Sequence, residues 1–265
     1  MTAGGALTGT RVLIPRGGAW GDRVAEGVRR RGGDPVIAPL IASAPPRDTD
    51  ARDRAFAALA AGEYAWLFVT SAASVEQLVA QGVTIPAHSR IAAVGPATAR
   101  AVAAAGAEVA FVPLGESSAA AMAAQWCDGR SPQATGRALI VRSDLASAVI
   151  SDELQLRGFG VDVCIAYRTV GVDLDPAVVE ALRSGTIDVV LLTSLSVGRE
   201  LRRQAGALPA SVRVASIGPG TTRDAEALGF TVAHTARTQS VDALLAELDA
   251  AAPAVAPHDH SRGLR

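Results

Sequence analysis

Residues 90–113 read RIAAVGPATARAVAAAGAEVAFVP, and residues 213–236 read RVASIGPGTTRDAEALGFTVAHTA. Each stretch is a short apolar run, a Gly-Pro turn and an amphipathic segment that ends at a glycine. Without any gap, residues 66–110 align with residues 189–233 at 16 identical positions out of 45. Self-similarity at a fixed offset is the mark of a duplicated chain. The fold must therefore be built from two related halves.

A weaker repeat covers the beginning of each half. RVLIPR at residues 11–16 matches RALIVR at residues 137–142. The offset is 137 − 11 = 126 here and 213 − 90 = 123 in the longer block. Each half is thus predicted to be strand, helix, strand, followed by the strongly repeated block.

Short apolar runs alternate with amphipathic stretches along the whole chain, which is the pattern of an α/β fold with strands buried on both faces. The predicted strands are residues 11–15, 36–40, 66–70, 91–94, 109–112, 138–142, 161–167, 189–193, 214–217 and 231–233. The predicted helices are residues 21–31, 52–61, 75–80, 98–105, 119–126, 149–157, 177–183, 197–204, 222–228 and 241–248. We therefore predict doubly wound parallel sheets. Residues 251–265 have linker composition and are predicted to be a disordered tail.

Composition excludes several classes of function. The 265 residues are 49% hydrophobic and 19% charged, with a formal net charge of −1, so no basic surface for nucleic acid is indicated. The sequence shows neither a signal-peptide profile nor an apolar run of membrane-spanning length, and we expect a cytoplasmic protein with no membrane partner. Cys127 and Cys164 lack metal-ligand spacing and are predicted to be small buried hydrophobes. The four histidines are isolated, so no metal site is expected.

Polar residues follow the predicted strands at their carboxyl ends, where open parallel sheets bind their ligands. Helices that begin there supply free N–H groups and favour anions, so two such sets would suit a large polyanion. The candidate binding residues are Arg16, Thr70, Ser71, Thr98, Arg142, Thr193, Ser194, Thr221 and Thr222. Taken singly, each Thr or Ser can equally be a helix cap, and each arginine can equally form a surface ion pair. The Gly-Pro-Gly turn at residues 218–220 lacks the spacing of a dinucleotide fingerprint.

The motifs VTSAASV, VGPATARAV, AYRTV, LLTSLSV and SIGPGTTRDAEALG, in that order, resemble the uroporphyrinogen-III synthase family. The resemblance runs from about residue 11 to residue 248, and the order and spacing of the motifs carry it. It implies two flavodoxin-like α/β domains joined by a pair of antiparallel strands. One domain would comprise residues 1–38 and 171–250, and the other would be residues 42–168. The duplicated halves would then be interleaved between the domains.

The resemblance also implies an activity, that of a lyase in haem biosynthesis. This activity cyclises hydroxymethylbilane to uroporphyrinogen III with inversion of ring D, and it implies neither a metal nor an organic cofactor. Tyr167 matches the tyrosine of the family's Tyr-x-Thr-Val segment and is the candidate general acid; alternatively, its ring packs at the inter-domain connection. The family often has Arg-Gly and then a second basic residue where this chain has Arg142-Ser143 and Ala146-Ser147, which weakens the case for side-chain contacts from this loop.

The same resemblance implies a monomer that could receive its unstable substrate through transient contact with hydroxymethylbilane synthase. Two alternatives remain open. One is a catalytically silent ligand-sensing module on the same fold, and the other is a bilobed binding protein for a small anion. No DNA-binding pattern follows Leu248 and no secretion signal is present, so the enzyme is the leading interpretation.

Overall fold

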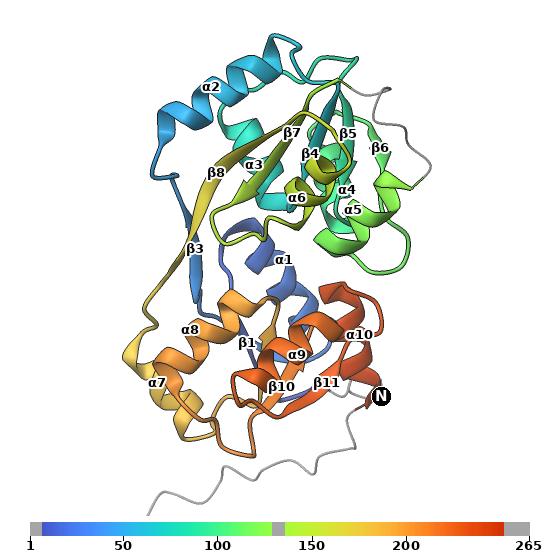
Figure 1. Cartoon of the computed structure of the whole chain (residues 1–265). Helices are drawn as coiled ribbons and strands as arrows, with labels where there is room; N and C mark the ends of the chain where they lie inside the picture. The colour runs from blue at the N-terminus through green and yellow to red at the C-terminus, as the bar shows by residue number, and fades with distance from the viewer. Residues whose placement is uncertain (1–6, 129–135, 252–265) are drawn as a thin grey trace, which may run out of the picture. The chain divides into compact units, whose positions relative to one another are not determined.

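The computed structural model describes residues 7–128 and 136–251. The chain divides into two compact units, unit 1 from residues 1–42 and 171–265 and unit 2 from residues 43–170. In Figure 1, blue elements of the beginning of the chain and orange-red elements of its end together make up unit 1, while unit 2 runs from light blue to yellow. Segments that are far apart in sequence are thus neighbours within unit 1.

Unit 1 is built on a parallel sheet of five strands in the order β11-β10-β9-β1-β2. The strands are β1 (Arg11–Ile14), β2 (Asp34–Ile37), β9 (Val189–Leu192), β10 (Arg213–Ser216) and β11 (Val232–Thr235). The helices are α1 (Gly18–Arg29), α7 (Pro176–Arg183), α8 (Leu195–Ala205), α9 (Pro219–Ala227) and α10 (Val241–Ala251). Alternate strand residues enter two cores: Leu13 and Val190 pack with α7, α8 and α9, whereas Val12 and Val189 pack with α1 and α10. Helices therefore cover both faces of the sheet.

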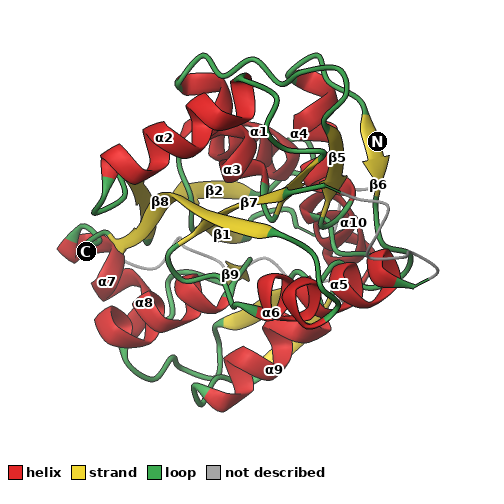
Figure 2. Cartoon of the chain, turned by 45° about the horizontal axis from the view of Figure 1, so that its top comes forward, coloured by secondary structure: helices red, strands yellow, loops and turns green. Residues whose placement is uncertain are grey.

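Unit 2 has a sheet of six strands in the order β3-β8-β7-β4-β5-β6. The strands are β3 (Ile41–Ala44), β4 (Trp66–Val69), β5 (Arg90–Ala93), β6 (Val109–Phe111), β7 (Ala138–Ser143) and β8 (Val161–Gly171). The helices are α2 (Thr49–Ala60), α3 (Ala72–Ala80), α4 (Pro96–Ala104), α5 (Ala119–Cys127) and α6 (Val149–Leu156). Figure 2 shows α2, α3 and α4 on one side of β7 and β8, with α5 and α6 on the other. Beneath α5, the Trp126 ring meets Phe68 and Phe159 edge to face, with centroids 5.0 and 5.1 Å apart.

Both sheets share one strand order once the duplication is considered. Counted from β1 in unit 1 and from β7 in unit 2, each five-stranded parallel region reads second, first, third, fourth, fifth, which is the flavodoxin-like order. Unit 1 takes its first two strands from the first half of the chain and the other three from the second half, and unit 2 does the reverse. Each unit is therefore completed by both halves.

The predicted helices and strands all have counterparts among the described residues, with two informative differences. The sequence pattern misses β3, because its four residues lie between Pro39 and Pro45 and carry no continuous apolar run. The strand predicted at residues 36–40 instead begins at Asp34, since Asp34 and Pro35 pair with β1 in parallel register. Pro35 is tolerated there because β2 lies at the edge of its sheet.

Two further predictions concern the chain end and the cysteines. The predicted tail begins one residue too early, because Ala251 closes α10; residues 252–265 lie outside the described part of the chain. Cys127 and Cys164 are buried and are not joined in a disulfide, as predicted. Burial raises the pKa of the Cys164 thiol to about 12, which keeps it protonated.

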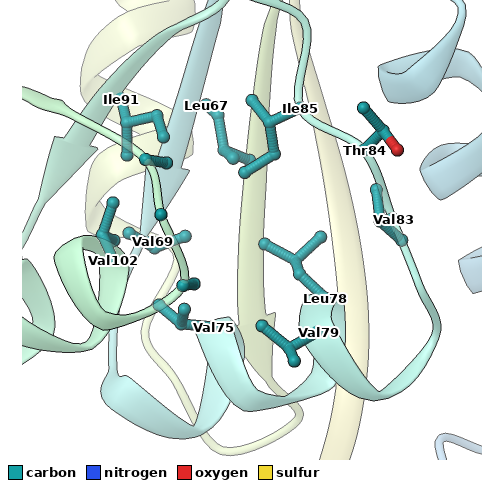
Figure 3. Close-up of a pocket in the computed structure, with 13 residues that line it drawn as sticks. Leu67, Val69, Val75, Leu78, Val79, Val83, Thr84, Ile85, Ile91 and Val102 are labelled. Atoms are coloured by element: carbon teal, nitrogen blue, oxygen red, sulfur yellow. The ribbon is translucent and has the colours of Figure 1, made fainter.

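A cavity of about 340 Å³ lies in unit 2 between α3, α4 and the sheet (Figure 3). Apolar side chains surround it, including Leu78 of α3 and Val102 of α4, and the hydroxyl of Thr84 points away from them. Only small residues, 105–107, line it at the end of α4. Val79, one of its lining residues, is 59% exposed, so the cavity opens to solvent and part of its apolar lining is hydrated.

We predict that Ala107→Val stabilises the protein, because the added methyl groups reach into this cavity. Cavity-filling changes typically raise the free energy of unfolding by about 0.5–2 kcal/mol. Chemical denaturation with an unchanged m-value measures the gain. Ala110→Val is the control, since Ala110 is an exposed residue of β6 that does not line the cavity. An equal effect of both substitutions would mean that strand propensity, and not cavity filling, is responsible.

Candidate functional site

The topology singles out one position in each unit. In unit 1, β1 leads to α1 on one face of the sheet, while its neighbour β9 leads to α8 on the other. In unit 2, β7 leads to α6 and its neighbour β4 leads to α3, again on opposite faces. Loops that leave neighbouring strands in opposite directions mark the switch point at which open α/β sheets bind ligands.

The predicted site residues lie at or beside these two sheet edges, in two equivalent sets. The set in unit 1 comprises Arg16, Thr193, Ser194, Thr221 and Thr222. The set in unit 2 comprises Thr70, Ser71, Thr98, Arg142 and Tyr167. In each set the arginine comes from one half of the duplicated chain and the Thr and Ser residues come from the other. The duplication has thus placed an arginine and a Thr-Ser pair at both edges.

The two serines are helix caps. Ser71 Oγ accepts the N–H of Ser74 at 3.1 Å at the start of α3, and Ser194 Oγ accepts the N–H of Val197 at 3.4 Å at the start of α8. Beside the first cap, Thr70 Oγ1 donates to the carbonyl oxygen of Val141 at 3.4 Å and so ties β4 to β7. These hydroxyls stabilise the edges on which any ligand would rest.

Helices α4 and α9 begin without such caps. Their N-caps are Gly95 and Gly218, and no side chain accepts from the first N–H groups. Those groups have no acceptor within the helix and, with the helix dipole, attract anions. Glycine is needed at position 95 because a Cβ there would lie 2.4 Å from Ser117 Oγ. Thr98 and Thr221 are only 3% and 9% exposed, which favours packing roles for both and leaves the backbone N–H groups as the anion-binding element.

Thr222 holds the α9 turn together. Its Oγ1 lies 2.6 Å from Thr235 Oγ1 and donates to the carbonyl oxygen of Gly218 at 3.3 Å. The sequence analysis does not select Thr235, although it lies at the carboxyl end of β11, where the rule that found the other candidates applies equally. Thr222 therefore shapes the turn through a hydroxyl pair that only the fold brings together.

The two arginines are engaged locally. Arg142 Nη1 donates to the carbonyl oxygens of Ala146 and Ser147, at 2.7 and 2.6 Å, and its Nε is buried without a hydrogen-bond partner in the described structure. The Arg16 guanidinium lies over the ring of Trp20, 5.3 Å from its centroid. Within residues 7–128 and 136–251 neither arginine forms an ion pair. Arg142 instead closes its own loop.

Tyr167 packs through its ring and makes a hydrogen bond through its hydroxyl. Its ring, 7% exposed, packs in the core beneath α2, α3 and α4, and its hydroxyl lies 2.9 Å from Ser71 Oγ. Ser71 Oγ also lies 3.0 Å from Ser74 Oγ, which completes a row of three hydroxyls. The sequence analysis misses Ser74, although a polar residue three positions after a helix cap is a recurring pattern.

A carboxylate ties α10 to the end of β11. Glu247 accepts from His234 Nε2 at 3.0 Å and from the backbone N–H of Arg237 at 3.2 and 3.3 Å. Burial raises the pKa of the Glu247 carboxyl, but its hydrogen bonds and the neighbouring cationic groups outweigh this, so that the pKa lies below its ordinary value.

No group of three or more His, Cys, Asp or Glu side chains in the described part of the chain could hold a metal ion. None of the helices described has the length and apolar character needed to span a bilayer.

The fold and these edges define a class: a duplicated two-unit α/β protein whose sheets each present an uncapped helix start beside a switch point. The family model described as uroporphyrinogen-III synthase HemD matches residues 22–246. This chain belongs to the uroporphyrinogen-III synthase family.

Solved structures have the same fold. A mutant uroporphyrinogen III synthase from Thermus thermophilus superposes with a TM-score of 0.61 at 21% identity, over 91% of this chain and 98% of that one. The uroporphyrinogen-III synthetase from Helicobacter pylori gives 0.58 at 14% identity, over 91% and 98% of the two chains. At such low identities the likeness concerns the fold, and the family match carries the assignment.

We predict that Glu247→Gln destabilises the protein more at about pH 5.5 than at about pH 3. The folded-state pKa is lowered, so the stabilisation is present above the ordinary value of 4.5 and is lost as the pH falls through the folded pKa. Denaturation midpoints at the two pH values measure it. Glu226→Gln, at an exposed glutamate of α9, is the control. A difference between Glu247→Gln and the natural protein that is independent of pH would show that the carboxylate charge is not responsible.

Proposed function

We propose that this chain cyclises hydroxymethylbilane to uroporphyrinogen III with inversion of ring D. Membership of the uroporphyrinogen-III synthase family supports this activity. The observation that carries the mechanism is the pair of equivalent sheet edges, each with an uncapped Gly-Pro helix start. Each of these helix starts offers N–H groups to an anionic group of the substrate.

The substrate's eight carboxylates are bound mainly by backbone N–H groups in this proposal. With a formal net charge of −1 the chain carries no excess of cationic side chains to bind them. The first turns of α4 and α9 offer N–H groups together with the positive end of the helix dipole. These donors are fixed by the helices, so binding costs little conformational entropy in the protein.

The chemistry needs orientation more than reactive side chains. Loss of the hydroxyl group leaves an azafulvene cation, which the pyrrole itself stabilises. Ring D attacks through its substituted carbon to give a spiro-pyrrolenine, which fragments and recloses in the inverted sense. Holding one folded conformer of the bilane is an orientation effect of the kind that lowers barriers most. Tyr167, whose hydroxyl lies at the edge of unit 2, is the general acid for the departing hydroxyl.

The finer architecture is part of the same proposal. We infer that the two units are the family's two domains and that β3 and β8 form their antiparallel connection. The two strands are neighbours in the sheet of unit 2 and contain the points where the chain passes between units. Nearby, the N–H of Val172 donates to the carbonyl oxygen of Leu40 at 2.9 Å. We further propose a cytoplasmic monomer that takes its unstable substrate from hydroxymethylbilane synthase in transient contact.

The identity of the product isomer tests the activity. Added to freshly made hydroxymethylbilane, the protein should divert the product from isomer I, formed by unaided closure, to isomer III. Chromatography of the oxidised products distinguishes the two. Unchanged isomer I would favour a catalytically silent sensing module or a small-anion binding protein on the same fold.

We predict that Thr222→Ala weakens substrate binding and leaves isomer III as the product. Loss of its two hydrogen bonds loosens the α9 turn and its hold on a carboxylate. A hydrogen bond to a charged group is worth about 1.5–3 kcal/mol, so kcat/KM should fall roughly tenfold to a hundredfold, mostly through KM. Thr231→Ala is the control because Thr231 is exposed and lies outside the turn. If kcat and KM of Thr222→Ala equal those of the natural protein, Thr222 does not contribute to substrate binding.

A further inference from the structure

The duplication supplies an internal comparison for the cap serine of each unit. Ser71 and Ser194 stand at equivalent positions, 194 − 71 = 123 residues apart. Ser74, beside the first, is replaced by Val197 beside the second. The two caps thus share the hydrogen bond to the helix N–H but differ in the groups around the oxygen.

Tyr167 is also confined to one unit. Val163 of β8 pairs with Ile140 as Ile37 of β2 pairs with Ile14, an offset of 163 − 37 = 126 residues. Continued along the sequence without a gap, this offset matches Tyr167 with residue 167 − 126 = 41, which is an isoleucine. Only the edge of unit 2 combines a cap serine with a phenol and a second serine hydroxyl.

Counting hydrogens restricts how the three hydroxyls are arranged. A serine hydroxyl donates once and accepts twice. Ser71 Oγ already accepts the N–H of Ser74 at 3.1 Å, so it accepts from one hydroxyl neighbour and donates to the other. In one arrangement Tyr167 donates to Ser71, and in the other Ser74 donates to Ser71 and Ser71 donates to the phenolic oxygen. Only the second arrangement leaves the phenolic proton free for a ligand. The Ser74 side chain is fully buried, so this support does not depend on solvent.

We propose that Ser71 is a positioning residue for Tyr167, which it orients and supports while the phenol gives up its proton. This inference rests on the proposed function. As the substrate C–O bond breaks, the leaving hydroxyl takes its electron pair and the phenolic proton and departs as water. The Ser71 hydroxyl then donates to the phenolate oxygen, and the proton released from the pyrrole carbon at ring closure restores the phenol. Ser194, with Val197 and Ile41 at the matching positions, has no such role.

A kinetic double-mutant cycle tests the coupling. Ser71→Ala should lower kcat roughly tenfold to a hundredfold, since a hydrogen bond to a charged oxygen is lost, while KM changes little. Tyr167→Phe should lower kcat by no more than the ~10²–10⁴-fold expected of a general acid. In the Tyr167→Phe background, Ser71→Ala should cost less than about threefold more, because the group that it supports is gone. Ser71→Thr keeps the hydroxyl and should restore most of kcat.

Two controls separate the proposed role from capping. Ser118→Ala removes the cap of α5, where Ser118 Oγ accepts the N–H of Ala121 at 3.1 Å, and should lower stability while kcat stays near that of the natural protein. Chemical denaturation of the natural protein, the two single variants and the double variant measures the Ser71–Tyr167 hydrogen bond independently of activity. The loss of midpoint in the double variant should be smaller than the sum of the two single losses.

The outcomes distinguish the two proposals. If the natural protein makes isomer III but the effects of Ser71→Ala and Tyr167→Phe on kcat multiply, the coupling is overturned and the activity stands. The coupling is likewise overturned if the loss of denaturation midpoint in the double variant equals the sum of the losses in the two single variants. If the natural protein leaves isomer I unchanged, the activity fails, and with it the catalytic role of Ser71. The coupling is established if the effects of Ser71→Ala and Tyr167→Phe on kcat are less than multiplicative and Ser71→Thr restores kcat.

Discussion

The structure depends on two strand pairs that join the halves of a duplicated chain. In unit 1, Val12 and Leu13 of β1 lie beside Val189 and Val190 of β9, and in unit 2 all four residues of β4 pair with β7. Each pair is the centre of its sheet, and each brings together residues more than 70 positions apart in sequence. Neither half has a complete core of its own, because each supplies only part of either sheet. The loop-closure entropy of this arrangement is offset by apolar surface buried on both faces of each strand.

The same pairs create the sites. Because the helices that follow the paired strands pack on opposite faces, the loops diverge there and leave the carboxyl ends accessible to a ligand. The duplication then ensures that both edges carry an arginine, a Thr-Ser pair and a Gly-Pro helix start. The backbone amides at these helix starts have oriented dipoles that favour anions without adding net charge.

The two edges nevertheless differ in detail. Unit 1 has the Thr222–Thr235 hydroxyl pair, whereas unit 2 has alanine at the position matching Thr222 and places a phenol against its cap serine. Unit 2 also closes the loop after β7 through the Arg142 guanidinium, which donates to carbonyl oxygens where the family often supplies further basic side chains. The two edges have thus kept similar turns while their hydroxyl contacts have diverged after duplication.

The sequence by itself determined the elements and the duplication. Apolar runs of four or five residues, such as Trp66–Val69, locate buried strands because hydrophobic burial imposes a local pattern. The glycine turns mark the helix starts for the same local reason. The short edge strand β3 and the length of β8 escape such reasoning, since β3 is defined only by its pairing with β8, which lies between β3 and β7.

The tertiary structure alone decided how the candidate residues are used. From residue type and position in the sequence, Ser71, Thr70 and Arg142 can equally be ligand contacts or structural groups. Their hydrogen bonds to Ser74, Val141 and the loop after β7 favour structural roles, and the hydroxyl contact between Ser71 and Tyr167 spans 96 residues. Local sequence fixes backbone conformation because its forces act between near neighbours. Hydrogen-bond partners are fixed only when strand pairing brings distant segments within about 3 Å of one another.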